Sequence, residues 1–296
     1  MKITLVSSGA LGDTLLLAPL LRSLKQRWPS AQRTLVTRQS FGELLLELNL
    51  IEHFADGENP MHSAWFSSGR ISNAITPKWA ACDLLISAVS NGADNWSWHA
   101  TTLSSAHEVF YFSPRPPENF SGHITEFHRA QLVKLNLPEP DLPTLAFKAD
   151  GPVMIHPGSG GQAKCFPLND FVGIARSLVK RGVNVAFILG EAELERWDAK
   201  AIGSLEEEFA LIRHPSLPRL ADLLANARSY LGNDSGVSHL AGALGLPTVA
   251  IFITGNPRQF KPIGPRVMVI EPQKSVNFQQ IAELLEYWGY PAVRVP

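Results

Sequence analysis

The chain has 296 residues, of which 45% are hydrophobic and 18% are charged, and its formal net charge is -1. This length exceeds that of most single domains, and the apolar content suffices for ordinary buried cores, so we expect two domains. The near-neutral charge gives no bulk electrostatic reason to expect a nucleic-acid partner.

The cysteine content indicates a reducing compartment. Cys82 and Cys165 are too few for a disulfide framework or a zinc cluster, so we expect the cytoplasm and no metal site. Lys2 precedes an apolar run that resembles a signal peptide. Gly12 and Asp13 interrupt this run, so we do not expect a signal peptide. No uncharged apolar run reaches the about 18 residues of a membrane span, which leaves at most peripheral membrane contact.

The first half of the chain alternates short apolar runs with amphipathic runs. The former predict strands, and the latter predict helices with an apolar stripe, such as Leu17, Leu21 and Leu24. The expected strands are 3–6, 33–37, 51–54, 83–88 and 108–112, and the expected helices are 14–27, 41–48, part of 71–81, and 123–135.

A loop of small residues from 7 to 12 follows the first strand. Gly9 and Gly12 do not complete the GxGxxG dinucleotide fingerprint, because Ser7 stands where the first glycine would be. Asp13 follows at the start of the expected helix, where a carboxylate commonly caps the backbone. The alternative is a functional carboxylate at the mouth of a cleft, and the loop alone leaves both roles open.

Trp96, Trp98 and His99 lie close together in a segment, 91–99, that we expect to be a loop or a helix start. A pyranose ring has an apolar face and a hydroxyl rim, which indole rings with nearby polar groups can bind. Tryptophan is also commonly buried as an anchor beneath a loop. These residues therefore form either an acceptor-side sugar surface or a structural anchor.

A proline-bearing run from 137 to 152 separates the two halves. We expect an N-terminal domain at 1–140, a linker at 141–152, a C-terminal domain at 153–275, and a terminal segment at 276–296 that packs back across the domains. In the second half the expected strands are 153–156, 184–189, 209–212, 229–231, one that ends at 252, and 267–270. The expected helices are 169–180, one that begins at 190, 217–227, 237–244 and 278–288. A loop is expected over 253–264.

A glycine-rich turn at 157–161 follows the first strand of the second half, and Lys164 follows the turn. Backbone N–H groups in such a turn can point at an anion, and the lysine adds a mobile positive charge. The spacing is not that of a Walker A loop, because Ala163 precedes the lysine and Cys165 follows it. Glu193, expected to be exposed at a helix start, either supports the helix dipole or accepts from ribose hydroxyls.

The stretch from 229 to 252 carries the strongest pattern of the chain. Asp234 and Ser235 are favoured N-cap types, and Gly236 lets a ligand approach the backbone. The helix that follows would present free N–H groups and a positive dipole end, which attract a phosphate. His239 emerges near the same face as Ser235. The alternative is a capped helix with one satisfied histidine.

The alternation of strands and helices in both halves predicts an α/β fold with two doubly wound domains and a cleft between them. Ligands of such domains bind at the carboxyl ends of the strands. Asp13, Lys164, Glu193 and the turn at 234–236 all fall at such ends. They therefore predict a phosphate site with a carboxylate on the opposite wall.

Several motifs, taken together and in order, resemble glycosyltransferase family 9, the ADP-heptose:lipopolysaccharide heptosyltransferases of the GT-B fold. The resemblance spans nearly the whole chain, and its most specific part is Asp-Ser-Gly-x-Ser-His at 234–239. The matching segments are 9–13 with Pro19, 123–137, 156–159 with Lys164 and Pro167, 189–190 with Glu193, and 233–241.

The resemblance implies an inverting transfer of a heptose from ADP-heptose to a hydroxyl of a lipopolysaccharide core, without a cofactor. Asp13 resembles the general base, Lys164 the phosphate-neutralising lysine, and Glu193 the ribose contact. The implied partners are a nucleotide-sugar donor and a glycan or glycolipid acceptor, in the cytoplasm or at the inner face of the inner membrane. No DxD motif occurs, in agreement with metal independence. The expected donor contacts are Ser8, Gly9, Gly12, Ser159, Lys164, Glu193, Asp234, Ser235, Gly236 and His239.

Two positions depart from the family pattern: Phe166 replaces a tryptophan, and the loop 253–257 lacks the family's carboxylate. Two other functions remain open. A sugar-nucleotide epimerase would share the two-domain architecture, and a non-catalytic sugar-nucleotide-binding protein would retain only the C-terminal pocket. A serine hydrolase is disfavoured, because Asn233 and Val237 replace the glycines of GxSxG around Ser235.

Overall fold

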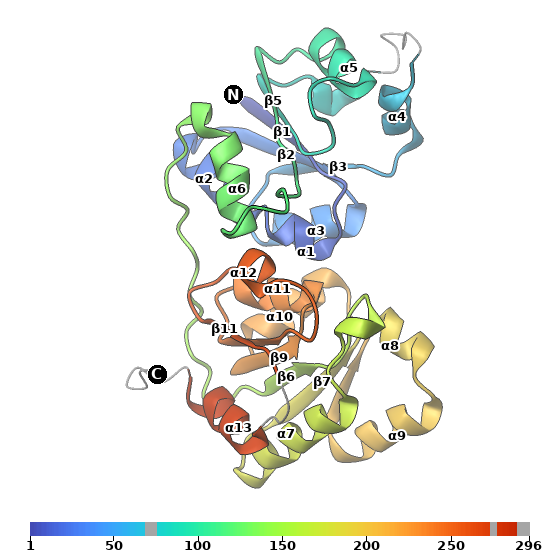
Figure 1. Cartoon of the computed structure of the whole chain (residues 1–296), viewed down its shortest axis with the longest axis vertical. Coiled ribbons are helices and arrows are strands. Elements are labelled where there is room, and N and C mark those ends of the chain that lie inside the picture. Colours follow the sequence, from blue (N-terminus) through green and yellow to red (C-terminus); the bar gives the residue numbers. More distant parts are fainter. Residues whose placement is uncertain (69–75, 273–276, 289–296) are drawn as a thin grey trace. The chain divides into compact units, whose positions relative to one another are not determined.

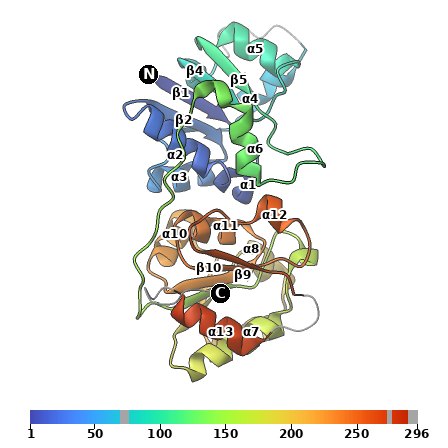
Figure 2. The same cartoon turned by 60° about the vertical axis from the view of Figure 1, so that its left-hand side comes forward.

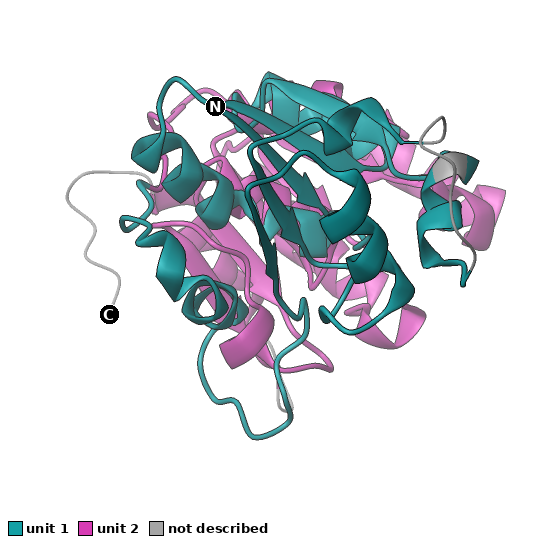
Figure 3. Cartoon of the chain, turned by 90° about the horizontal axis from the view of Figure 1, so that it is seen from above, with its two compact units in different colours: residues 1–141 teal, residues 142–296 magenta. Residues whose placement is uncertain are grey.

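The computed structural model describes residues 1–68, 76–272 and 277–288. The chain divides into two compact units, Met1–Asp141 and Leu142–Pro296, which Figure 3 shows in different colours. Each unit contains one parallel sheet with its own helices (Figure 1). None of the helices in the described ranges combines the length and apolarity needed to cross a membrane.

The sheet of the first unit has the strand order β3-β2-β1-β4-β5, and all of its pairs are parallel. The central strand is buried because helices cover a parallel sheet, and Leu5 pairs with Leu35 on one side and Ile86 on the other. The strands are β1 (Lys2–Val6), β2 (Gln32–Thr37), β3 (His53–Asp56), β4 (Leu84–Ser87) and β5 (Glu108–Tyr111).

The helices of the first unit include two that lie side by side, α2 and α6, as Figures 1 and 2 show. The α-helices are α1 (Leu11–Leu15), α2 (Ala18–Arg27), α3 (Gln39–Glu47), α4 (Pro60–Ser63), α5 (Asn95–Leu103) and α6 (Ile124–Gln131). Short 3₁₀ helices are η1 (Ala64–Phe66), η3 (Lys78–Ala80) and η4 (Val133–Leu135).

The expected helix over 14–27 is wrong as one continuous element. It is divided into α1 and α2, and Pro19 occupies an early position of α2. Proline lacks the N–H that an unbroken helix would need there, and its ring would clash with the carbonyl four residues back. The expected helix at 123–135 also ends early, with a 3₁₀ turn after Leu132. The helix expected within 71–81 falls partly outside the described residues.

The sheet of the second unit has the order β11-β10-β9-β6-β7-β8 and is also parallel throughout. Its strands at 153–156 and 267–270 match the sequence prediction. The strands are β6 (Val153–His156), β7 (Val185–Leu189), β8 (Ala210–Arg213), β9 (Ser229–Asn233), β10 (Thr248–Ile251) and β11 (Val267–Ile270).

The helices of the second unit pack an apolar core in which Phe171, Ile174 and Leu178 are fully buried. Helices α7 and α13 lie side by side, and Ser229 Oγ donates to the Leu285 carbonyl at 2.8 Å. The segment expected as a loop over 253–264 contains a short helix, α12, which begins at a proline. The helices are α7 (Leu168–Lys180), α8 (Glu191–Arg196), α9 (Ala199–Glu208), α10 (Leu217–Ala225), α11 (Gly236–Ala243), α12 (Pro257–Phe260), α13 (Phe278–Tyr287) and the 3₁₀ turn η5 (Gln162–Lys164).

Each sheet has a point at which the direction of chain progression reverses. In the first sheet it lies between β1 and β4, and in the second it lies between β6 and β9. Doubly wound folds bind ligands at this point, outside the carboxyl ends of the strands, because the loops there diverge. The segments that follow β1 and β9 are the ones that carry Asp13 and Asp234.

Candidate functional site

A cavity of about 260 Å³ in the first unit contains Asp13. Ser7 and Ser8, which follow β1, line it together with Ala88, which follows β4. The cavity thus lies at the reversal point of the first sheet, where such folds bind ligands.

The Asp13 carboxylate accepts a hydrogen bond from the backbone and also lines this cavity. Its Oδ2 accepts the Ala10 N–H at 3.2 Å and lies 3.4 Å from Nη2 of Arg115. A Cβ on Gly9 would come within 2.6 Å of the Asp13 Cβ, so this approach requires glycine. The side chain of Asp13 is 31% exposed, which leaves it open to a ligand. Gly12 lies in α1 rather than in the preceding loop.

His128 forms a buried wall of the Asp13 cavity, and no sequence pattern had indicated it. Its Nε2–H donates to the Pro114 carbonyl at 3.2 Å. Its Nδ1 is buried and has no hydrogen-bond partner within the described part of the chain. Burial lowers the pKa of His128 and outweighs the opposing effects of the Pro114 carbonyl and Asp13, which favours the neutral imidazole.

The expected acceptor-side residues differ sharply in burial. Trp96 and His99 are 2% and 1% exposed, whereas Trp98 is 51% exposed. His99 Nδ1 is held 2.9 Å from the Trp65 carbonyl, which fits the structural-anchor alternative. Trp96, by contrast, lines a second cavity of about 260 Å³, here called the aromatic pocket. Its walls include Arg38, Phe66, Trp79 and Trp96, and it shares Ser7 and Ser8 with the Asp13 cavity.

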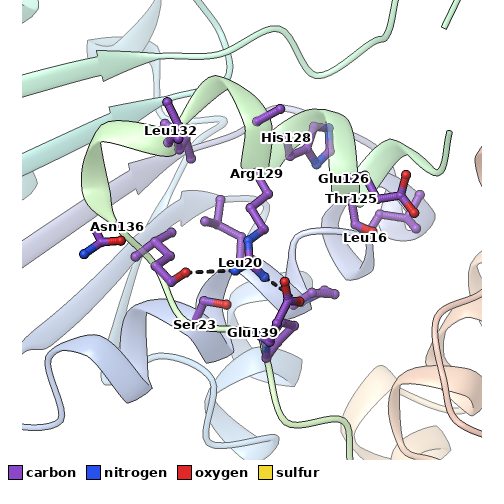
Figure 4. Close-up of a pocket in the computed structure, with 15 residues that line it drawn as sticks. Leu16, Leu20, Ser23, Thr125, Glu126, His128, Arg129, Leu132, Asn136 and Glu139 are labelled. Carbon is purple, nitrogen blue, oxygen red and sulfur yellow. Dashed lines mark hydrogen bonds and ion pairs between the residues drawn. The ribbon is translucent and has the colours of Figure 1, made fainter.

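A further cavity of about 460 Å³ lies between α2 and α6 (Figure 4). Arg129 donates to the Leu137 carbonyl at 2.9 Å and pairs with Glu139. Ser23 Oγ donates to the Pro138 carbonyl at 2.8 Å. These polar side chains thus bind the chain segment beside the cavity, and they tie that segment to α2 and α6.

The second unit places the predicted phosphate residues together at the reversal point of its sheet. Lys164 Nζ lies 2.6 Å from Asp234 Oδ2, and the Asp234 side chain is only 11% exposed. Ser159, which is buried, donates from Oγ to the Asp234 carbonyl at 2.8 Å. The glycine-rich turn, the lysine and the turn after β9 therefore form one cluster, here called the phosphate cradle.

Helix α11 begins in the phosphate cradle. Ser235 is its N-cap, and the Ser238 N–H donates to Ser235 Oγ at 3.4 Å. The N-terminal N–H groups of α11 and its positive dipole end thus point toward the predicted phosphate position. His239 is 6% exposed, and its Nε2 lies 4.0 Å from Asp234 Oδ1.

The sequence predicts an exposed Glu193, and this prediction is wrong. The residue is buried, with 4% of its surface exposed. Its Oε2 accepts the Gly190 N–H at 2.9 Å and lies 3.4 Å from Nε2 of His156. Burial works to raise the pKa of Glu193, but the contacts with His156 and with the Gly190 N–H outweigh it and lower the pKa. A Cβ on Gly158 would lie 1.9 Å from Glu193 Oε1, so this glycine makes room for the carboxylate.

His156 links Glu193 to the start of α11. Its Nδ1 lies 3.4 Å from Ser235 Oγ, on the opposite side of the ring from Glu193. An imidazole that donates from Nε2 to Glu193 presents Nδ1 as an acceptor for the Ser235 hydroxyl. The buried carboxylate therefore orients Ser235 through the imidazole.

Two other residues, whose roles no sequence motif indicates, support the phosphate cradle. Asn233 is 0% exposed; it accepts the Phe166 N–H at 2.9 Å and donates to the Pro157 carbonyl at 2.8 Å. Arg196 of α8 donates to the carbonyls of Ser159 and Gly160 at 3.3 and 3.2 Å. The contacts that Asn233 and Arg196 make with the glycine-rich turn use its carbonyl oxygens, so they leave its N–H groups for other partners.

The two departures from the family pattern occupy different environments. Phe166 is buried and makes an edge contact with Phe171, with ring centroids 5.5 Å apart. Gly255 has φ +98°, which favours glycine, and an added Cβ would lie 3.7 Å from Asp234 Oδ2. The loop before α12 therefore reaches the phosphate cradle. Across the described ranges, no three His, Cys, Asp or Glu side chains are grouped as for a metal ion.

Comparison with known proteins identifies the family. The model of glycosyltransferase family 9 (heptosyltransferase) matches residues 125–286, which is more than half of the chain. The chain belongs to glycosyltransferase family 9. The family resemblance seen in the motifs is thus confirmed.

Two curated relatives show how far the sequence similarity extends. The chain is 27% identical over 204 residues to lipopolysaccharide heptosyltransferase 1 of Pseudomonas aeruginosa, covering 68% of this chain and 54% of that protein. It is 29% identical over 115 residues to lipooligosaccharide heptosyltransferase 2 of Haemophilus influenzae, covering 37% of this chain and 33% of that protein. The aligned segments thus span about half of one relative and a third of the other.

Solved structures of similar proteins confirm the predicted fold. The E. coli heptosyltransferase WaaC with ADP aligns with a TM-score of 0.73 at 19% identity, over 97% of this chain and 99% of that chain. A family 9 glycosyltransferase from Veillonella parvula aligns with a TM-score of 0.71 at 19% identity, over 92% and 86% of the two chains. Two doubly wound α/β units, as in the GT-B fold, are therefore shown for this chain.

Proposed function

We propose that this family 9 protein transfers a sugar, a heptose from ADP-heptose, to a hydroxyl of a lipopolysaccharide core or related glycan. The names of its relatives support the donor and acceptor classes. The phosphate cradle carries the proposal for this chain, because Lys164 and the start of α11 form an anion site beside Asp234. On this proposal the second unit binds the donor and the first unit binds the acceptor.

The proposed reaction is a single displacement with inversion. The acceptor oxygen attacks C1 of the donor sugar as its proton passes to the Asp13 carboxylate. The C1–O bond to the diphosphate breaks, and ADP leaves with the electron pair. Lys164 and the N–H groups of α11 stabilise the negative charge that develops on the leaving group, so the step needs neither a metal nor a cofactor.

The other expected donor residues divide into contact and support roles in this proposal. Ser235, Gly236 and His239 contact the diphosphate or the donor sugar, and Ser8 and Gly9 lie beside the reacting hydroxyl. Ser159 holds the glycine-rich turn against Asp234. Glu193 contacts the ribose through the small exposed part of its carboxylate. Its main contacts are with the Gly190 N–H and with His156. We propose that the reaction takes place at the cytoplasmic side of the membrane that carries the acceptor.

The test is incubation with ADP-heptose and a lipopolysaccharide truncated before its heptose residues, with and without EDTA. The proposal predicts ADP release that requires the acceptor, survives EDTA and yields a product of inverted anomeric configuration. An isomerised sugar nucleotide formed from donor alone would instead support the epimerase. Binding of ADP-heptose with no ADP release with any acceptor would support the non-catalytic binding protein.

A further inference from the structure

The aromatic pocket lies directly beside the Asp13 cavity. The two cavities share Ser7 and Ser8, which follow β1, so a ligand that places a hydroxyl at Asp13 has this pocket as its neighbour. Thr37, the last residue of β2, and Arg38, which follows it, line the pocket as well, so the pocket also lies at the carboxyl ends of the strands.

The aromatic walls of the pocket are fixed by contacts behind them. Trp65 packs against both Trp79 and Trp96, with ring centroids 4.8 and 5.6 Å apart. Trp79 Nε1–H donates to His62 Nε2 at 2.8 Å. Phe66 is 52% exposed at the rim, so its ring remains open to a ligand. Rigid aromatic walls with one exposed ring suit the apolar face of a sugar.

The charges at the pocket are balanced. Arg38 Nε pairs with Glu58 Oε1 at 2.9 Å, and both residues line the pocket. A phosphorylated or carboxylated ring would have to compete with Glu58 for this guanidinium, whereas an uncharged ring can use both groups as hydrogen-bond partners. The pair therefore favours a neutral hydroxyl-rich ligand.

Thr37 supplies a polar group without a partner. It is 1% exposed and lines the pocket, and its Oγ1 has no hydrogen-bond partner among the described residues. Buried hydroxyls in proteins are normally satisfied, so a sugar that enters the pocket and shifts this side chain would gain a hydrogen-bond partner in the Thr37 hydroxyl.

We propose that the aromatic pocket is a subsite for an uncharged sugar ring of the acceptor, adjacent to the ring whose hydroxyl Asp13 deprotonates. The proposal rests on the transferase function proposed above. It revises the expected acceptor surface, because Phe66, Trp79 and Trp96 form the subsite while Trp98 and His99 do not line it.

The test uses methyl glycosides of glucose, galactose and mannose as neutral probes, and glucose 6-phosphate and glucuronic acid as anionic ones. Saturation-transfer NMR reports the contacts of the sugar ring, and the dependence of its signal on glycoside concentration gives the affinity. We expect at least one neutral glycoside to bind in the millimolar range and to bind about 2- to 10-fold more weakly to Phe66→Ala.

Trp98→Ala is the matched control, because Trp98 is an exposed aromatic residue of the same unit that does not line the pocket. It should leave glycoside binding unchanged. Thr37→Val, which keeps the shape of the side chain, provides a second variant and should also weaken binding. No binding by any neutral glycoside, binding by the anionic sugars alone, or equal weakening by Phe66→Ala and Trp98→Ala would overturn the subsite.

The glycoside measurement needs neither donor nor turnover, which keeps the two proposals separable. ADP-heptose binding is measured in parallel by thermal shift, and it should be the same in wild type and Phe66→Ala. If glycosides bind while ADP-heptose neither binds nor reacts, the proposed transferase fails and the sugar site remains. If ADP-heptose reacts while no glycoside binds, the subsite fails and the transferase remains.

Discussion

The phosphate cradle and the Asp13 cavity are built in opposite ways. In the cradle, the charged side chains already have partners, Lys164 with Asp234 and Glu193 with His156. In the Asp13 cavity, Asp13 pairs with Arg115, whose side chain is 67% exposed, and the buried Nδ1 of His128 has no hydrogen-bond partner in the described ranges. If the proposed function holds, the cradle is preorganised for the diphosphate, whereas the Asp13 cavity leaves the Nδ1 of His128 for its ligand to contact.

The largest expected effect separates the chemistry of the first unit from the binding of the second. Asp13→Asn keeps an oxygen for the Ala10 N–H but cannot accept a proton. Loss of a general base costs about 10²- to 10⁴-fold, so kcat for acceptor-dependent ADP release should fall by that factor. The control Asp150→Asn, at an exposed carboxylate of the other unit, should react like wild type. Unchanged kcat in Asp13→Asn would remove its role as the base.

The next largest effect tests how firmly the cradle is built. Asn233→Ala deletes hydrogen bonds to Phe166 and Pro157 and leaves buried backbone groups without partners. We expect a loss of about 3 kcal/mol in the free energy of unfolding, measured by urea denaturation. Asn226→Ala removes an exposed asparagine whose side chain donates to Asp222, and it should cost less than about 0.5 kcal/mol. Similar small losses in both variants would show that the cradle is not braced through Asn233.

A double-mutant cycle tests the packing of Glu193 against the glycine-rich turn. In Gly158→Ala the new methyl group displaces the Glu193 carboxylate, which should destabilise the second unit by about 1–3 kcal/mol. In the background Glu193→Ala the same substitution should cost much less, because the colliding carboxylate is absent. Additive losses in thermal or urea unfolding would contradict this contact.

The smallest expected effect concerns pH and the first unit. The pKa of His128 is lowered by burial, so the unfolded chain takes up a proton at higher pH than the folded one. Stability is therefore retained above the ordinary histidine pKa of about 6.5 and falls as the pH drops below it. His128→Gln should show a shallower loss of melting temperature between about pH 7 and 5. Burial also lowers the pKa of His62. Part of the pH dependence of the melting temperature should therefore remain in His128→Gln.

How well each site can be predicted from the sequence depends on whether its residues are close together in the chain. The phosphate cradle depends on local chemistry, an N-cap serine, a glycine turn and a lysine, so the turn at 234–236 and Lys164 could be recognised directly. The roles of Asn233 and Arg196 could not be recognised in this way, because their hydrogen-bond partners are backbone groups far away in the sequence. Glu193 was expected to be exposed because its position suits a helix start, and only packing against Gly158 shows that it is buried.

The first unit was less predictable because its cavities draw on distant segments. Thr37, Phe66, Trp79 and Trp96 come from four different elements, and nothing in their spacing brings them to one pocket. His128 gave no signal within its helix, although it lines the Asp13 cavity. The break between α1 and α2 could have been predicted, because Pro19 cannot continue the helix.

The central claim is that donor binding belongs to the cradle and proton removal to Asp13. Its most direct measurement is titration calorimetry of ADP-heptose with wild type, Asp13→Asn, Lys164→Ala and the exposed control Lys180→Ala. Loss of a charge-assisted contact should weaken donor binding about 10- to 100-fold in Lys164→Ala alone. Binding that is lost in Asp13→Asn and retained in Lys164→Ala would contradict the claim.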